Sequence, residues 1–164
     1  MTLHNDLIEQ AHHLALRDGT RPRQASLRRA VSAAYYALFH FLLDQGGRLM
    51  FPKNLPNLRL RAIRSFNHGE MRKVCERFAK STGIKDLTTN PLEIDLIDIA
   101  TIFVDLQEAR HRADYDLTEN FGRVQVLGYV NQARQAVTKW TAVKEFPNAR
   151  VFLVALSLHN RWNK

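Results

Sequence analysis

The residues whose types could do chemistry lie closest together between Glu108 and Asn120. Arg110, Asp114 and Tyr115 bring a guanidinium, a carboxylate and a phenol into one short stretch. Arg110 and Asp114 are four residues apart, so on a helix they share one face and can form an ion pair. On an exposed helix such a pair contributes only about 0.2–0.5 kcal/mol, and Arg before Asp is the weaker order. The stretch is therefore either an ion-paired helix end or a site that holds an anion through Arg110.

A second set of polar side chains recurs every four residues: Arg28, Ser32, Tyr36, His40 and Asp44. On a helix, neighbours in this set share a face, although the stripe drifts by about 40° per step. Any amphipathic helix shows a polar stripe beside an apolar seam, so a solvated face is one interpretation. Tyr36 and His40 also suit a site, because both can donate and accept hydrogen bonds from largely buried positions.

The sequence contains no established motif for a metal, a phosphate loop or an activated nucleophile. The seven His are scattered without a His-x3-His spacing, so no metal site is expected. There is neither a Walker pattern nor a G-x-G-x-x-G, and no Ser stands in a G-x-S-x-G turn. The sequence has one cysteine, Cys75, so an intramolecular disulfide is excluded. Cys75 is expected to be a small residue of the core. No cofactor is expected.

The charge and the length of the chain limit the classes of protein to which it can belong. A chain of 164 residues has the length of a single domain. Lys and Arg number 24 against 16 Asp and Glu, a formal net charge of +8 that attracts phosphate polymers or acidic partners. The arginines cluster in two places: Arg17, Arg21, Arg23, Arg28 and Arg29, then Arg59, Arg61 and Arg64. Each cluster could contact phosphate or could form a solvated face. No apolar stretch reaches 18 residues, so we expect a soluble cytoplasmic protein without a membrane segment.

Apolar residues at helical spacing predict the elements that position these groups. Helices are expected over residues 3–17, 24–45, 56–66, 69–81, 91–116 and 119–144. Gly46 and Gly47 are expected to end the second helix, Pro91 to begin the fifth, and Thr118 to cap the sixth.

The tail after Pro147 is predicted to be helical, although residues 151–158 could also form a buried strand. The predicted fold is all-α: an up-and-down antiparallel bundle of four to five helices with an extra C-terminal helix. The bundle is expected to span residues 1–144, with 145–164 as an extension packed on the bundle or on a dimer mate.

Three segments in combination resemble a HEPN domain, as in the small stand-alone bacterial and archaeal HEPN proteins. They are "SAAYYALFHFLL" (32–43), "SFNHGEMRKVCERF" (65–78) and "LQEARHRADYDL" (106–117), in an order and spacing that agree over about residues 5–140. The resemblance implies a helical bundle that dimerises through its Arg-containing helices. Many HEPN proteins are metal-independent ribonucleases that use an Arg followed four to six residues later by a His. Some are toxins beside a nucleotidyltransferase-like antitoxin.

Arg110 matches the Arg of that motif, but Tyr115 stands where the His is expected, followed by Asp116 and Leu117. Tyr, with an ordinary pKa near 10, is a poor general base at neutral pH, whereas His near 6.5 is a good one. If RNA is cleaved, His40 or His68 would have to deprotonate the 2′-hydroxyl while Arg110 stabilises charge on the phosphorane.

Three functions follow from the resemblance and the charge. The first is a non-catalytic or weakly active module of a toxin–antitoxin or defence-type system that binds RNA or a nucleotide in a basic cleft of a homodimer. Its candidate ligand-binding residues are Arg110, Asp114, Tyr36, Arg28 and Ser32. The second is a ribonuclease toxin in which Arg110 acts with His40 or His68. The third is a protein-interaction module that partners a nucleotidyltransferase.

Overall fold

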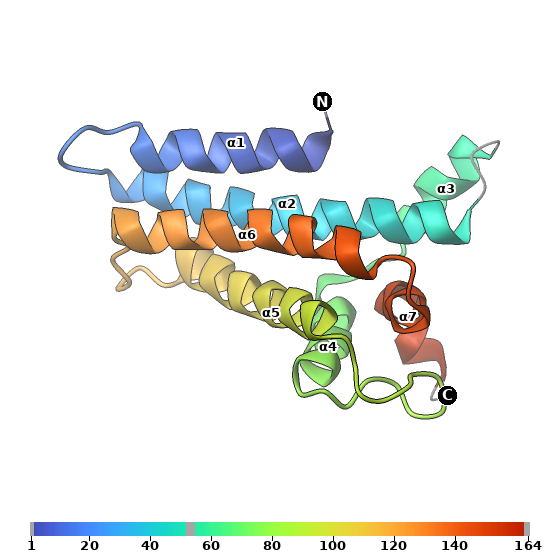
Figure 1. The fold of residues 1–164 in the computed structure, drawn as a ribbon. Coiled ribbons are helices and arrows are strands. Elements are labelled where there is room, and N and C mark those ends of the chain that lie inside the picture. The colour runs from blue at the N-terminus through green and yellow to red at the C-terminus, as the bar shows by residue number, and fades with distance from the viewer. Residues whose placement is uncertain (1, 52–54, 163–164) are drawn as a thin grey trace. The chain divides into compact units, whose positions relative to one another are not determined.

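The computed structural model describes residues 2–51 and 55–162, and within these ranges every regular element is a helix (Figure 1). The helices are α1 (Leu3–Leu16), α2 (Gln24–Met50), α3 (Pro56–Ile63), α4 (His68–Ala79), α5 (Ile94–Tyr115), α6 (Arg123–Val143) and α7 (Pro147–Trp162). The all-α prediction is confirmed, and the tail after Pro147 is the helix α7. No helix in the described ranges is long and apolar enough to cross a membrane.

Contacts group the residues into two compact units. The first unit comprises Met1–Phe41 and Ile102–Thr138, and the second comprises Leu42–Thr101 and Lys139–Lys164. Each of the long helices α2, α5 and α6 therefore contributes one part to each unit. The predicted boundary after residue 144 stays a prediction.

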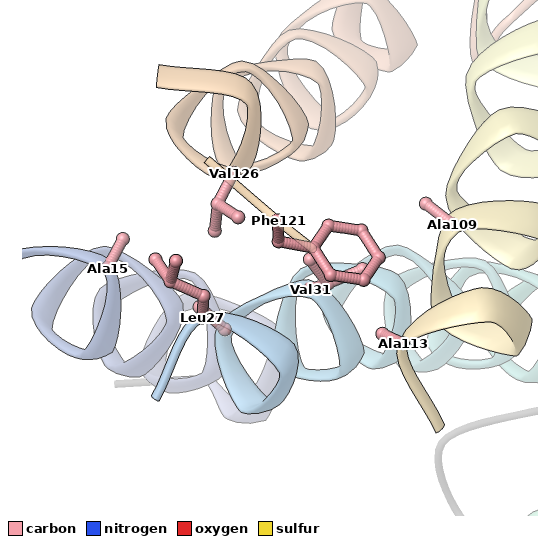
Figure 2. Close-up of a cluster of buried hydrophobic side chains, with 8 residues drawn as sticks. Ala15, Leu27, Val31, Ala109, Ala113, Phe121 and Val126 are labelled. Atoms are coloured by element: carbon pink, nitrogen blue, oxygen red, sulfur yellow. The ribbon is translucent and has the colours of Figure 1, made fainter. Parts of the chain in front are cut away.

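The first unit is built from antiparallel helices around a small apolar core. α1 runs antiparallel to the first part of α2, and the end of α5 runs antiparallel to the start of α6 (Figure 1). The buried cluster in Figure 2 consists of Ala15, Leu27, Ala30, Val31, Ala109, Ala113, Phe121 and Val126. The Phe121 ring fills the space that the two α5 alanines leave, because alanine side chains are short. These short side chains allow α5 to approach α2, where Ser32 bonds to Asp114.

The connection between α5 and α6 differs from the prediction. Thr118 does not cap α6, which begins five residues later at Arg123. The Thr118 hydroxyl instead donates to a carboxylate oxygen of Asp116 at 2.6 Å. The Gln24 side chain donates to the Phe121 carbonyl and accepts from the Phe121 N–H, both at 2.9 Å. These bonds hold the backbone outside a helix until Arg123.

In the second unit, α4 packs against α7, with the Phe78 and Phe152 rings edge to face at 4.9 Å. Pro91 does not begin α5, which starts at Ile94. The reason lies in the buried side chain of Asn148, whose Oδ1 accepts from the Thr89 N–H at 2.9 Å and whose Nδ2 donates to the Thr89 carbonyl at 3.0 Å. Thr89 is thereby tied to α7, and the helix begins only after this tether.

Gly46 and Gly47 do not end α2, which continues to Met50. A Cβ on Gly46 would lie 2.8 Å from the Phe66 ring, and one on Gly47 would lie 3.0 Å from the Ile63 side chain. The two glycines thus serve close packing of residues 63–66 against α2. A glycine pair marks a helix end only where nothing packs so closely against it.

Candidate functional site

The centre of the candidate site is a half-buried ion pair near the end of α5. Arg110 Nε lies 2.7 Å from Asp114 Oδ2, and each side chain is only 22% exposed. The pairing predicted from their spacing is therefore confirmed. The Nε–H is buried yet makes no well-directed hydrogen bond among the described residues, so charge attraction holds the pair. A pair so shielded from water is less screened than one on an open helix surface.

Two residues of α2 form hydrogen bonds with this ion pair. The Ser32 hydroxyl, in a side chain that is 6% exposed, donates to Asp114 Oδ1 at 2.7 Å. Arg110 Nη2 donates to the Tyr36 hydroxyl oxygen at 3.1 Å. Four of the predicted ligand-binding residues thus form one network across two helices. The network fixes the orientation of the guanidinium, whose Nη1 has no partner among the described residues.

Aromatic rings surround the Arg110 guanidinium. Its central carbon lies 5.5 Å from the Tyr36 ring centre, 5.8 Å from that of Tyr115 and 6.0 Å from that of Tyr35. Each such contact favours a positive charge, by about 0.5–2 kcal/mol depending on burial. Tyr115 is 65% exposed, and its ring centre lies 5.1 Å from that of His111. One wall of this aromatic enclosure is therefore open to a planar ligand.

Arg28, also predicted to bind ligand, donates its hydrogen bonds to the protein backbone. Nη1 donates to the Ala113 carbonyl at 2.8 Å, and Nη2 donates to the carbonyls of Asp116 at 2.9 Å and Glu119 at 2.6 Å. Carbonyls at a helix C-terminus lack hydrogen-bond donors within the helix, and the Arg28 guanidinium supplies such donors. Arg28 thus holds the end of α5 in place. Its partners lie more than 80 residues away along the chain, so no local signal could reveal this contact.

A hollow of about 380 Å³ adjoins the network, and we call it the Arg29 hollow. Its lining residues are Ala25, Arg28, Arg29, Ala113, Asp114 and Tyr115. Arg29 is exposed and was predicted only as part of a basic cluster. With two arginines, one aspartate and an exposed tyrosine ring, the hollow offers contacts to both a phosphate and a base.

The two histidines proposed as a substitute base lie in different units. His40 is half-buried on α2 one turn after Tyr36, with ring centres 6.2 Å apart. Burial lowers the pKa of His40 below its ordinary value, so the imidazole is neutral at pH 7. His68 is the first residue of α4 in the second unit, where Asn67 caps the helix by accepting from the backbone N–H groups of Gly69 and Glu70. His40 therefore belongs to the unit that holds Arg110, and His68 does not.

The arrangement suits the binding of anions by fixed arginines. No three His, Cys, Asp or Glu side chains gather into a metal-binding group in the parts of the chain that the structure describes. The groups present at the site are hydrogen-bond donors, aromatic rings and the neutral imidazole of His40.

No family model matches the chain, and no curated protein or solved structure matches it either. The resemblance of the three segments to HEPN domains therefore stays a prediction. Function has to be argued from the geometry of the site.

Proposed function

We propose that this chain is a HEPN-like module that binds RNA or a nucleotide at the Arg29 hollow and acts as a homodimer. One observation carries the proposal. The Arg110 guanidinium is held by Asp114 and Tyr36 beside a hollow that combines an exposed arginine with an exposed tyrosine ring. The net charge of +8 favours a polyanionic partner.

Each part of the ligand has a matching group. Arg29 is exposed and without an ion-pair partner among the described residues, so it can pair with a phosphate through two parallel hydrogen bonds. Arg110 adds a fixed positive charge next to it. The Tyr115 ring can stack on a base, an interaction worth about 1–3 kcal/mol. Phosphate and base recognition would then occur within one hollow.

The homodimer is supported by apolar side chains exposed near the same end of the first unit. Leu117 is 90% exposed and Val124 is 85% exposed, and both follow Tyr115 within ten residues. Large apolar side chains that are this exposed can mark a protein–protein interface. Analytical ultracentrifugation should give twice the chain mass, and Leu117→Ser combined with Val124→Ser should shift the mass toward the monomer.

RNA binding is tested with a labelled single-stranded RNA in EDTA, by anisotropy over a series of salt concentrations. Arg110→Ala and Arg29→Ala should each weaken binding about tenfold and reduce the salt slope by roughly 0.7 per lost phosphate contact. The matched control is Arg150→Ala, which removes the same charge from an exposed arginine on α7. Binding that does not change with salt, or that falls equally in all three variants, contradicts the proposal.

A metal-independent ribonuclease is the second candidate, because His40 offers a neutral imidazole one turn from the tyrosine that contacts Arg110. The same RNA in EDTA should then be cleaved by the wild type but not by Arg110→Ala or His40→Ala. His68→Ala tests the other proposed base. Bound but intact RNA favours the binding module.

A further inference from the structure

A second pocket lies in the second unit, far along the chain from the Arg29 hollow. It has a volume of about 220 Å³, and we call it the Trp162 pocket. Its lining residues come from the end of α4, the loop before α5 and the end of α7. Its lining residues are Arg77, Ile84, Lys85, Leu87, His159 and Trp162.

The lining of the pocket includes two cationic side chains, Arg77 and Lys85. Arg77 Nε donates to the Gly83 carbonyl at 3.1 Å, which orients the guanidinium and leaves its two terminal nitrogens without partners among the described residues. Lys85 is exposed and has no ion-pair partner in the described ranges. Among the residues that the structure describes, no carboxylate lines the pocket. The positive charge is therefore available to an anion of the right size.

The lining also includes apolar side chains and the Trp162 ring. Leu87 is 51% exposed and Trp162 is 39% exposed. The Trp162 ring lies edge-on to His159, with ring centres 6.2 Å apart. An exposed indole beside an exposed leucine provides a flat surface for a ring to stack on.

The loop that carries Lys85 and Leu87 is held in shape by Thr88. The Thr88 hydroxyl oxygen accepts from the Ile84 N–H at 3.1 Å, and the hydroxyl donates to the Ile84 carbonyl at 3.0 Å. Gly83 adopts a φ of +55°, where a Cβ would lie 2.3 Å from the Thr88 hydroxyl. The loop is thus preorganised, which reduces the entropy lost when a ligand binds.

We propose that the Trp162 pocket binds a phosphate monoester that carries a flat aromatic ring, as in a nucleoside 5′-monophosphate or the 5′-phosphorylated end of an RNA. Arg77 and Lys85 contact the phosphate, and Trp162 and Leu87 contact the base. A volume of about 220 Å³ limits the ligand to one nucleotide unit. The proposal does not depend on RNA binding at the Arg29 hollow, because it uses other residues in the other unit.

The test is calorimetric titration of the full chain with adenosine 5′-monophosphate, adenosine and inorganic phosphate. The monophosphate should bind at least tenfold more tightly than either of the other two, because only it can contact both the cationic side chains and the aromatic ring of the pocket. Lys85→Glu, a change on an exposed loop, should weaken this binding at least tenfold, and Arg77→Ala should do the same. Arg150→Ala on α7 removes one charge, as Arg77→Ala does, and as the matched control for that variant it should change affinity less than twofold. Binding that Lys85→Glu removes is assigned to the Trp162 pocket, and binding that only Arg110→Ala removes is assigned to the Arg29 hollow.

Two results would overturn the proposal. One is equal binding of adenosine and its monophosphate, and the other is a loss in Arg150→Ala as large as that in Arg77→Ala. Competition then distinguishes the two sources of the ligand. If a 5′-phosphorylated oligoribonucleotide displaces the monophosphate and its 5′-hydroxyl counterpart does not, the pocket holds an RNA end. If neither displaces it, the pocket holds a free nucleotide.

Discussion

The Arg29 hollow and the Trp162 pocket both combine arginine with an exposed aromatic ring, but their arginines are used differently. In the hollow, Arg28 donates to three backbone carbonyls, and Asp114 places a carboxylate in the lining. In the pocket, Arg77 makes one backbone hydrogen bond, and none of the described lining residues is a carboxylate. An arginine near a hollow is thus not by itself a ligand contact. Its remaining donors and the nearest carboxylate decide whether it supports the fold or an anion.

The largest expected effect is a loss of stability on substitution of Arg28, whose guanidinium donates to the backbone. Arg28→Ala leaves the carbonyl of Ala113 in α5, and those of Asp116 and Glu119 just after it, without their charged donor. Hydrogen bonds from charged groups contribute about 1.5–3 kcal/mol each. Because the site is partly open to water, we expect a loss of about 2–4 kcal/mol in the free energy of unfolding. Urea denaturation measures this loss.

The control for that change is the neighbouring residue. Arg29→Ala removes the same charge from an exposed side chain and should change stability by no more than about 0.5 kcal/mol. Equal losses in the two variants would mean that the carbonyl contacts of Arg28 contribute nothing measurable.

A smaller effect is expected where a carboxylate restrains an arginine. Asp114→Asn keeps the shape of the side chain but removes the charge that faces Arg110, so stability should fall by about 1–2 kcal/mol. Without the competing carboxylate, Arg110 should bind phosphate better, and RNA affinity measured by anisotropy should rise. Glu108→Gln, an exposed change on the same helix, is the matched control. Weaker RNA binding by Asp114→Asn would show that the carboxylate positions the guanidinium more than it competes with the ligand.

The smallest effect is a pH dependence that distinguishes the two regions. Burial lowers the pKa of His40 in the first unit, and burial also lowers that of His159 in the second, where Arg77 and Lys73 add to the shift and Glu70 opposes it. The unfolded chain, with ordinary His pKa values near 6.5, then binds more protons than the folded protein below about pH 7. Stability contributed by the neutral imidazoles should be fully present above pH 7 and should fall as the pH is lowered toward 5.5.

Urea midpoints at pH 7.5, 6.5 and 5.5 measure this decline. His40→Asn and His159→Asn should each make it shallower. A decline that neither variant changes would assign the pH dependence to other groups.

Much of the site could be predicted from sequence because its key contact is local. Arg110 and Asp114 are one helical turn apart, so the helix itself brings them together. The pairing of Ser32 with Asp114 could not be derived, since the two residues are 82 positions apart and meet only when α2 packs on α5. Spacing within α2 still selected Ser32 and Tyr36 as candidates, because both lie on the stripe that faces α5.

The errors at helix ends have the same origin. Gly46, Pro91 and Thr118 each carry a strong local signal for a helix end or start, and none of them marks one. In each case a contact within the tertiary structure prevails: the Phe66 ring against Gly46, the Asn148 tether on Thr89, and the Gln24 side chain on Phe121 after Thr118. The all-α class was predictable because apolar periodicity sums over whole helices, whereas a boundary depends on one or two residues.

Arginine also holds the connection between α1 and α2. Arg123 Nε donates to the Ala15 carbonyl at 3.0 Å, and its Nη2 donates to the carbonyls of Asp18 and Gly19. This connection contains Arg17, Arg21 and Arg23, which makes it an obvious cleavage site for trypsin-like proteases. A protease must draw the backbone into an extended strand, and it can do so only after the three carbonyls leave Arg123. An arginine on α6 thus protects a nick site about one hundred residues earlier, and the lifetime of the chain in a proteolytic environment depends on it.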